Sequence, residues 1–474
     1  MEYTKAIELS TELKQALTTA QAWYFHVIPA GIEKSVIQFY SSDQNDIDST
    51  SSELEVMLGR EVRLLSVPEA WLLEHLTRYY PNAHQNRGTE MLNTKSQDLL
   101  TLMLEEAARI KSSDIHLEAF EQRCRVRFRI DGKLVERYIV PSPEYPALIN
   151  KIKIKAHLDI SEKRLPQDGR IIYDQSGYKF DIRVSILPTL HGEKVVLRLL
   201  NRDATQIQLD RLGFTRGQLN TYHEGVKNPN GIVLISGPTG SGKTTTLYAT
   251  LKLLNKNETN ILTIEDPIEY TLEGINQVQL KESIGLTFAS ALRTFLRQDP
   301  DIIMVGEIRD TETAQMAIRA ALTGHLVLST VHTNSAWGTI NRLIDMGIPP
   351  YLIASTLKLS AAQRLVRILC PKCKKETSFS SSEFPRAFTA PFIPEEHFIA
   401  VGCSDCYFTG YHGRRAVYEI IAIDENLQEQ IRTNQLDATT YFSQTKTETI
   451  SQQAFKLFTE GETSLIEVYS LFNL

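Results

Sequence analysis

Residues 237–244 read Gly-Pro-Thr-Gly-Ser-Gly-Lys-Thr and match the pattern G-x-x-x-x-G-K-[ST] at every fixed position. A short apolar run at residues 232–235 precedes this stretch, and a sequence suited to a helix follows from Thr245. A strand, a glycine-rich turn and a helix in this order form a loop whose backbone N–H groups point at phosphate oxygens. The helix dipole further favours the bound anion. The motif therefore predicts a phosphate-binding loop inside an α/β sheet.

The whole loop is predicted to contact a nucleotide. Lys243 would place its charge at the β- and γ-phosphates, and the Thr244 hydroxyl would ligate Mg²⁺. We therefore predict ATP and Mg²⁺ as ligands. The predicted nucleotide-contacting residues in this part of the chain are Gly237, Pro238, Thr239, Gly240, Ser241, Gly242, Lys243, Thr244 and Thr245.

Three further apolar runs predict strands of the same sheet, at residues 261–264, 302–305 and 326–331. Helical patterns, including those at 288–297 and 311–321, separate them. Alternating strands and helices of this kind form a largely parallel sheet with helices on both faces. Functional side chains of such a sheet lie at the carboxyl ends of its strands.

Acidic side chains follow two of these predicted strands. Glu265, Asp266 and Glu269 come after the strand at 261–264, and Glu307 comes after a Walker B-like strand at 302–305. A single acid in a loop is usually solvated, but two groups that end neighbouring strands favour a catalytic interpretation. Hydrolysis needs a carboxylate to position or deprotonate water. We predict Glu307, Glu269 and Glu265 as candidates for that role.

Two histidines bracket the strand at 326–331. Their odd separation places His325 and His332 on opposite faces of a strand, so we expect only one of them to reach a given phosphate. His332, at the carboxyl end, is the predicted γ-phosphate sensor, and His325 is predicted to be structural or to face a neighbouring subunit. Arg293, Arg297 and Arg309 are candidate arginine fingers, although a lone arginine on a helix is often a surface charge.

Four of the five cysteines form two CxxC pairs, separated by 29 residues. Each pair spans two corners of a tetrahedral zinc site, and two pairs complete a closed structural site. Redox chemistry is the competing interpretation, and the second pair makes it less favourable. We predict structural Zn²⁺ on Cys370, Cys373, Cys403 and Cys406. The fifth cysteine, Cys124, lies in a predicted strand and is expected in a core.

The 474 residues exceed the size of one core, and three regions are expected. Residues 1–88 have the pattern of a small α/β domain that ends in a polar linker at 80–88. Residues 89–205 are expected to form a second α/β domain. Residues 206–474 contain the phosphate-binding loop and a cysteine loop at about 368–410.

The second region has its own periodicities. A helical pattern occupies 99–110, and residues 124–130 and 180–186 alternate apolar side chains with polar ones, as strands do. Arginines occupy the polar faces of these strands. A turn is expected at Asp131-Gly132.

Composition limits the location and the partners of the chain. The formal net charge is -6 and the pI is about 6.1, which do not favour a protein held mainly by nucleic-acid phosphates. No apolar run approaches the roughly 20 residues that span a bilayer, and no secretory signal is visible at the start. We therefore expect a cytosolic protein, in which any membrane association comes through partners or a surface contact.

From about residue 95 onward the sequence resembles the secretion ATPases of type II secretion and type IV pilus assembly. The segments that carry this resemblance are 113–118 (SDIHLE), 127–132 (RFRIDG), 164–170 (RLPQDGR), 192–194 (GEK), 263–269 (TIEDPIE), 296–301 (LRQDPD), 306–310 (GEIRD), 323–334 (TGH through TVHTN) and 362–365 (AQRL). All four cysteines fit the zinc loop of this family.

The resemblance implies an α/β architecture with a RecA-like P-loop motor domain, a preceding PAS-like α/β domain and a small N-terminal α/β docking domain. It also implies a homo-hexamer that is peripheral to the cytoplasmic face of the inner membrane. The implied partners are an integral platform protein and a cytoplasmic docking protein of the machine. Arg170 and Arg183 match arginines with which the family's second domain reaches the nucleotide phosphates.

The first 88 residues match the family weakly. They lack the repeated RLG-type segments through which some relatives bind a cyclic dinucleotide, so that ligand is not predicted. The leading hypothesis is an ATP-hydrolysing assembly motor. The alternatives are a retraction ATPase, which generally lacks the cysteine loop, a nucleic-acid-translocating motor, which the acidic balance disfavours, and a scaffold that binds ATP without turnover.

Overall fold

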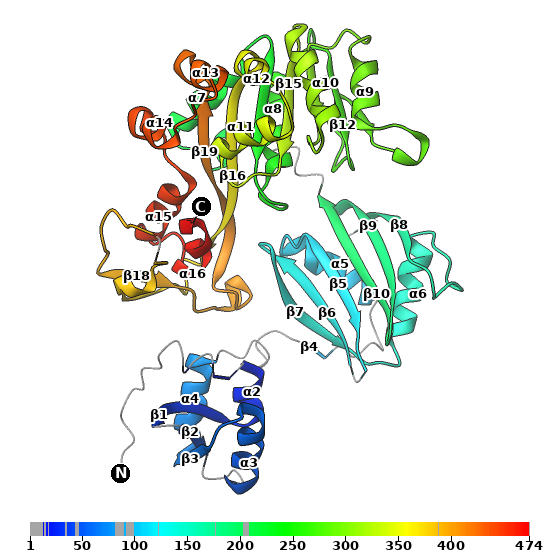
Figure 1. The fold of residues 1–474 in the computed structure, drawn as a ribbon. Coiled ribbons are helices and arrows are strands. Elements are labelled where there is room, and N and C mark those ends of the chain that lie inside the picture. Colours follow the sequence, from blue (N-terminus) through cyan, green and yellow to red (C-terminus); the bar gives the residue numbers. More distant parts are fainter. Residues whose placement is uncertain are drawn as a thin grey trace. The chain divides into compact units, whose positions relative to one another are not determined.

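A computed structural model describes residues 13, 16–17, 19–33, 36–42, 47–80, 90–91, 99–121, 123–175, 177–201, 208–386 and 388–473. The chain divides into two compact units, residues Met1–Thr89 and Glu90–Leu474 (Figure 1). Of the predicted linker at 80–88, only Tyr80 lies within the described residues. No helix in the described part of the chain is long and apolar enough to cross a membrane.

The first unit is a small α/β fold built on a three-stranded sheet of order β1-β2-β3. β1 and β2 are antiparallel, and β2 and β3 are parallel neighbours joined through a helix. Ile28, Phe39, Leu54 and Leu72 are fully buried between sheet and helices. The bounds are α2 Thr19–Tyr24, β1 Val27–Glu33, β2 Val36–Ser42, α3 Ile47–Leu58, β3 Val62–Val67 and α4 Glu69–Tyr79.

The second unit begins with a seven-stranded sheet of order β4-β7-β6-β5-β10-β9-β8. Its strands are antiparallel neighbours apart from the β4–β7 pair. The bounds are β4 Glu90–Met91, α5 Leu99–Arg109, β5 Asp114–Ala119, β6 Cys124–Ile130, β7 Lys133–Val140, α6 Tyr145–Lys155, β8 Gln167–Gln175, β9 Tyr178–Thr189 and β10 Gly192–Asn201.

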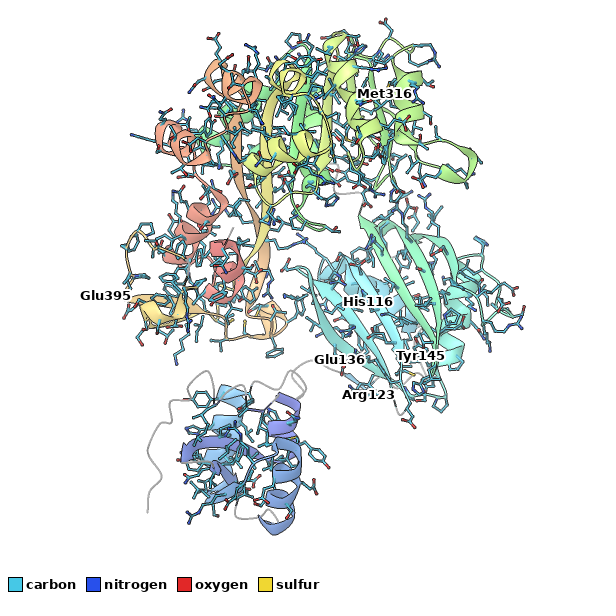
Figure 2. The ribbon with its side chains drawn as sticks, viewed as in Figure 1. His116, Arg123, Glu136, Tyr145, Met316 and Glu395 are labelled. Carbon is cyan, nitrogen blue, oxygen red and sulfur yellow. The ribbon has the colours of Figure 1, made fainter. Side chains whose placement is uncertain are left out.

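The alternation predicted for residues 124–130 is confirmed in β6. Cys124, Val126 and Phe128 are buried in the core that α5 and α6 cover, and the intervening arginines lie on the other face. The predicted turn at Asp131-Gly132 joins β6 to β7. Tyr145, labelled in Figure 2, begins α6. Its hydroxyl donates a hydrogen bond to the Glu193 carbonyl at 2.7 Å.

On the polar face of this sheet, Glu118 of β5 accepts hydrogen bonds of 2.9 Å from Arg125 and of 2.8 and 2.9 Å from Arg127. Burial alone would raise the pKa of the Glu118 carboxyl, but these hydrogen bonds lower it to about 2.

A carboxylate with a depressed pKa stabilises the fold above its unfolded pKa, and that contribution is lost as the pH falls through the folded value. We therefore expect Glu118→Gln to lower the free energy of unfolding at neutral pH and to cost progressively less between about pH 4.5 and about pH 2. Denaturant unfolding of both proteins across this range measures the effect. The exposed Glu121→Gln serves as control, and a cost for Glu118→Gln that did not change with pH would contradict the assignment.

The phosphate-loop sheet also has seven strands, in the order β13-β12-β14-β15-β11-β16-β19. All neighbours are parallel except β16 and β19, so the predicted parallel sheet is confirmed. The strand bounds are β11 Gly231–Ser236, β12 Ile261–Glu265, β13 Asn276–Gln279, β14 Ile302–Val305, β15 Leu326–Val331, β16 Leu357–Leu369 and β19 Tyr411–Ala422.

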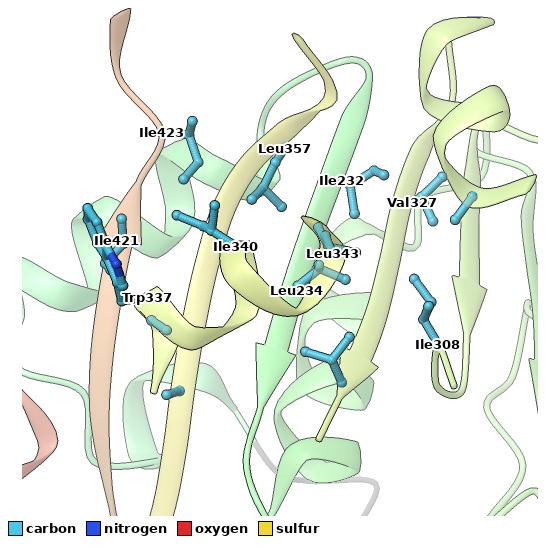
Figure 3. Packing of buried hydrophobic residues seen from close by; sticks show 14 of the residues in the cluster. Ile232, Leu234, Ile308, Val327, Trp337, Ile340, Leu343, Leu357, Ile421 and Ile423 are labelled. Atoms are coloured by element: carbon cyan, nitrogen blue, oxygen red, sulfur yellow. The ribbon is translucent and has the colours of Figure 1, made fainter. Parts of the chain in front are cut away.

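Helices cover both faces of this sheet. Val233 and Ile235 of β11 pack with α7 and α8, and Ile232 and Leu234 pack on the opposite side with α9 to α12. Figure 3 shows the second side, where Trp337, Ile340 and Leu343 of α11 lie over the strands. The helix bounds are α7 Arg216–Val226, α8 Lys243–Leu254, α9 Phe288–Phe295, α10 Thr311–Leu322, α11 Ala336–Asp345 and α12 Pro350–Thr356. The helix expected from Thr245 begins at Lys243, and the one expected over 288–297 ends at Phe295.

β16 and β19 continue past the sheet as an antiparallel ribbon that ends in the cysteine loop. Phenylalanines of this loop, among them Phe384 and Phe388, pack against Phe455, Phe458 and Phe472 near the carboxyl end. The remaining elements are β17 Lys375–Ser378, β18 Glu396–Ile399, α13 Glu425–Arg432, α14 Ala438–Thr445, α15 Ile450–Thr459 and α16 Leu465–Val468, with 3₁₀ turns at Leu209–Arg211, Glu282–Ile284, Ser381–Glu383, Ser404–Cys406 and Tyr469–Asn473.

Candidate active site

The loop at 237–244 joins β11 to α8 through glycines with positive φ. Gly237, Gly240 and Gly242 have φ of 147°, 80° and 90°. A Cβ at Gly237 would lie 2.5 Å from the Gln363 carbonyl oxygen, so no larger residue fits. The Lys243 ammonium donates to the Gly237 carbonyl at 2.7 Å and to the Pro238 carbonyl at 3.2 Å. The Lys243 side chain therefore folds back onto the backbone of the phosphate-binding loop.

This loop borders an open cavity of about 940 Å³ in the second unit. Residues at the carboxyl ends of β12, β14 and β15 line the cavity, as expected for a parallel sheet. Of the sequence-predicted site residues, those that line it are Thr239, Gly240, Ser241, Gly242, Lys243, Thr244, Thr245, Glu265, Glu269, Glu307, Arg309 and His332. Gly237 and Pro238 lie at the start of the same loop.

Glu307 is paired with two basic side chains in this cavity. It follows β14 and accepts hydrogen bonds from Arg309 and from His332, whose Nε2 lies 3.0 Å from the carboxylate. Burial alone would raise the pKa of Glu307, but the hydrogen bond and charge of Arg309, followed by those of His332, lower it. Glu307 is therefore ionised at neutral pH. The electrostatic attraction between it and Lys243 partly offsets the burial that lowers the pKa of the lysine.

The other two predicted acids have different surroundings. Glu265, only 3% exposed, accepts hydrogen bonds from the Tyr248 hydroxyl, from Thr263 at 2.6 Å and from Gln277 at 3.1 Å. Glu269 is partly exposed and lies 3.6 Å from Arg183. Glu265 is thus fixed within the β12 edge, whereas Glu269 faces a cation.

The two histidines lie at opposite ends of β15. His332 reaches Glu307, whereas the His325 ring nitrogen Nδ1 is 2.8 Å from the Ala320 carbonyl at the other end of the strand. The two rings therefore lie at opposite ends of β15, and the expectation that only one of them reaches a given phosphate stays a prediction.

The predicted arginines are distributed over several environments. Arg293 pairs with Glu312 on the exposed side of α9, and Arg297 donates to the Arg293 carbonyl at 2.8 Å. Arg170 forms a 2.6 Å ion pair with Asp181, its neighbour on β9. Arg183 donates to the Ile268 carbonyl within the acidic segment. Of the five predicted arginines, Arg183 and Arg309 lie at the acidic segment, with Arg309 Nη2 3.9 Å from Asp266. The other three are held in local contacts.

Sequence reasoning missed four charged residues that line the cavity, Asp114, Arg129, Arg198 and Arg414. Asp114 binds Arg129 Nε at 3.1 Å and Arg198 Nε at 3.0 Å. The alternating arginines of β6 were a visible signal of this polar face. Nothing in their spacing says which of them faces the cavity.

The four paired cysteines meet in one cluster whose sulfur atoms all lie within 4.8 Å of one another. The Sγ separations include 3.9 Å for Cys370–Cys403, 3.7 Å for Cys373–Cys406 and 3.8 Å for Cys403–Cys406. Backbone N–H groups of Gly402 and Gly410 point at two of these sulfurs, each at 3.3 Å. Cys124 is buried in the core of the first sheet of the second unit, as predicted.

Comparison with known proteins agrees with this architecture. The family model described as type II/IV secretion system protein matches residues 92–470. The type II secretion system protein E of Pseudomonas aeruginosa is 49% identical over 393 residues, which cover 81% of this chain and 78% of the relative. The type IV pilus assembly ATPase PilB of Myxococcus xanthus is 51% identical over 340 residues, covering 70% of this chain and 60% of the relative.

Solved structures share the RecA-like fold. The ATPase DotB of Legionella pneumophila aligns with a TM-score of 0.61 at 22% identity, covering 81% of this chain and 98% of that one. The pilus retraction motor PilT with bound ADP aligns with a TM-score of 0.54 at 27% identity, covering 79% and 97%. The resemblance and the fold class predicted from the motifs are therefore confirmed: the chain belongs to the type II/IV secretion system protein family.

Proposed function

We propose that this chain is an ATP-hydrolysing motor that powers assembly of a type IV pilus or a type II secretion pseudopilus. The observation that carries the hydrolytic part is the placement of Glu307, Arg309 and His332 in the same cavity as Lys243 and Thr244. The names of the relatives, a secretion protein E and a pilus assembly ATPase, support the assembly part.

In the proposed reaction each group has one task. The loop N–H groups and Lys243 hold the β- and γ-phosphates, and Glu307 positions the attacking water and accepts its proton. His332 and Arg309 keep the Glu307 carboxylate ionised and oriented. The Thr244 hydroxyl would hold Mg²⁺, which would supply positive charge beside the phosphates. Glu265 supports the β12 edge, and Glu269 orients Arg183 beside the site.

We further propose three functional regions, with residues 1–88 docking to the machine, 89–205 closing on nucleotide and 206–474 acting as the motor. Closure would have to release Arg170 from Asp181 before that arginine could reach phosphate. Charged groups already on the cavity, Arg129 and Arg198, are the better placed members of the second region. The chain would act as a homo-hexamer on an inner-membrane platform protein and a cytoplasmic docking protein. No direct contact with nucleic acid is proposed.

A genetic comparison separates assembly from the alternative of retraction. Deleting the gene from its host should remove the filament or block secretion, and a wild-type copy should restore it. Cells that instead keep or accumulate filaments would show that the motor retracts them. Purified protein should release phosphate only with Mg²⁺, and stimulation of this release by DNA would favour a nucleic-acid motor.

The cysteine cluster fits a structural zinc ion. A Zn–S bond of about 2.3 Å places the corners of a tetrahedron about 3.8 Å apart, and the measured Sγ separations are 3.7, 3.8 and 3.9 Å. We propose that Cys370, Cys373, Cys403 and Cys406 hold Zn²⁺, which would fasten the two ends of the loop.

Purified protein should therefore contain about one zinc ion per chain by elemental analysis. Cys373→Ser should lower the zinc content severalfold and reduce the melting temperature, because the loop loses its closure. Ser404→Ala, in the same loop, is the matched control and should leave both unchanged. Native protein without zinc, or full zinc content in Cys373→Ser, would refute the site.

A further inference from the structure

Strand β16 supplies a wall of the phosphate loop that the motif itself does not contain. Ala362 of β16 pairs with Ser236, the last residue of β11. The next residue, Gln363, accepts a hydrogen bond from Thr246 of α8 at 2.9 Å, and its amide nitrogen lies 2.8 Å from the position of a Cβ on Gly242. Gln363 therefore contacts the loop where it enters α8.

Arg364 follows and is the buried cation of this wall, 7% exposed. Its guanidinium donates to the Gln363 carbonyl at 3.0 Å, to the Asn334 carbonyl at 2.9 Å and to Asn334 Oδ1 at 3.3 Å. Nη1 also lies 3.2 Å from the position of a Cβ on Gly237. These partners are neutral oxygens, so the planar fork of arginine serves here to join two backbone segments.

One of these segments, residues 332–336, connects β15 to α11 and begins with the histidine bound to Glu307. Arg364 holds it at Asn334, and the Ser236 hydroxyl donates to the Ser335 carbonyl at 3.3 Å. At its far end the Ala336 N–H donates to the buried Glu419 carboxylate at 2.8 Å. The segment is thus tied to the start of the phosphate loop on one side and to β19 on the other.

We propose that Arg364 is a positioning residue: by fixing Asn334 against the phosphate loop, it holds His332 in contact with Glu307. This inference deepens the proposed function and rests on the role given there to His332 and Glu307. Only Thr333 separates Asn334 from His332, so a displaced Asn334 backbone moves the imidazole relative to the carboxylate. Arg364 has no hydrogen bond to the side chain of His332 or Glu307 and acts through its bonds to the carbonyl and the Oδ1 of Asn334.

The test is a double-mutant cycle in steady-state ATP turnover, with nucleotide affinity measured separately by ADP binding. Arg364→Lys keeps the charge but loses the fork, and should lower kcat about tenfold while the Kd for ADP stays within about threefold. His332→Gln should also lower kcat. Because residues that act as a unit are non-additive, the double variant should be no more than about threefold slower than the slower single variant.

Arg367→Lys is the matched control, since Arg367 lies on the same strand, is similarly buried and bonds Glu467 away from the loop. It should leave kcat within about twofold. The inference would be overturned if the reductions of kcat in Arg364→Lys and His332→Gln multiply in the double variant. It would also be overturned if Arg364→Lys lost as much ADP affinity as kcat. Either result would leave the proposed function intact. If His332→Gln alone leaves kcat unchanged, the role of the histidine in the proposed function fails.

Should Arg364→Lys not fold, the same cycle is run with Asn334→Ala, which removes the Oδ1 acceptor and keeps the backbone carbonyl. A reduction of kcat by about threefold that is absent in the His332→Gln background supports the inference. An effect of equal size in both backgrounds overturns it.

Discussion

Replacing Lys243 with alanine is expected to lower ATP turnover by at least about a thousandfold, because the site loses its main positive charge on the transferred phosphoryl group. The ammonium lies in the loop, 2.7 Å from the Gly237 carbonyl. Phosphate release in the presence of Mg²⁺ measures the loss, and a fluorescent nucleotide measures binding.

The matched control for this variant is Lys256→Ala. Lys256 follows the same helix, α8, and is exposed to solvent. The ATP turnover and the melting temperature of the Lys256→Ala variant should match those of the unchanged protein. Near-normal turnover in Lys243→Ala, with the control intact, would remove the phosphate loop from the reaction and with it the whole assignment of the cavity.

The second large effect is expected from Glu307→Gln. Glutamine keeps the shape of the side chain but cannot accept a proton, so hydrolysis should slow by about a hundredfold to a thousandfold while ATP binding is retained. The lowered pKa of Glu307 means that the wild-type carboxylate is already ionised at neutral pH. Single-turnover phosphate release separates this chemical defect from binding.

Companion variants decide which acid is the base. Glu269→Gln should have a smaller effect, since Glu269 is paired with Arg183 at 3.6 Å. Glu312→Gln removes the exposed partner of Arg293 and should leave turnover unchanged. An unchanged rate in Glu307→Gln together with a severe loss in Glu269→Gln would transfer the base role to Glu269.

Much of the motor fold could be predicted because its signals are local. Apolar runs of four to six residues gave β12, β14 and β15 to within one residue, and the motif gave the β11–α8 junction. β16 was harder to anticipate, because its thirteen residues mix buried apolar and polar side chains. Two of the polar ones, Gln363 and Arg364, are buried, and the phosphate loop lies against them.

The site was predictable where a residue ends a strand and less so where it lies on a helix. Glu307 and His332 follow β14 and β15, and parallel strands bring such ends together. Arg293 is a candidate only because it is near the other site residues in the sequence. In the structure Phe288, Leu292 and Phe295 occupy the buried side of α9, which leaves Arg293 on the solvent side. The cavity-lining Arg198 and Arg414 come from distant segments and carry no local signal.

The aromatic packing between the cysteine loop and the carboxyl-terminal helices has a consequence for translation. All four cysteines leave the ribosome before Phe455, Phe458 and Phe472. The four sulfur atoms can therefore come together while the phenylalanines that pack on one face of the loop are not yet made. Phe384 and Phe388 stay uncovered until the last helices are made. A nascent chain that stalls or ends near residue 445 would therefore display a phenylalanine surface of the kind that chaperones bind and that drives aggregation.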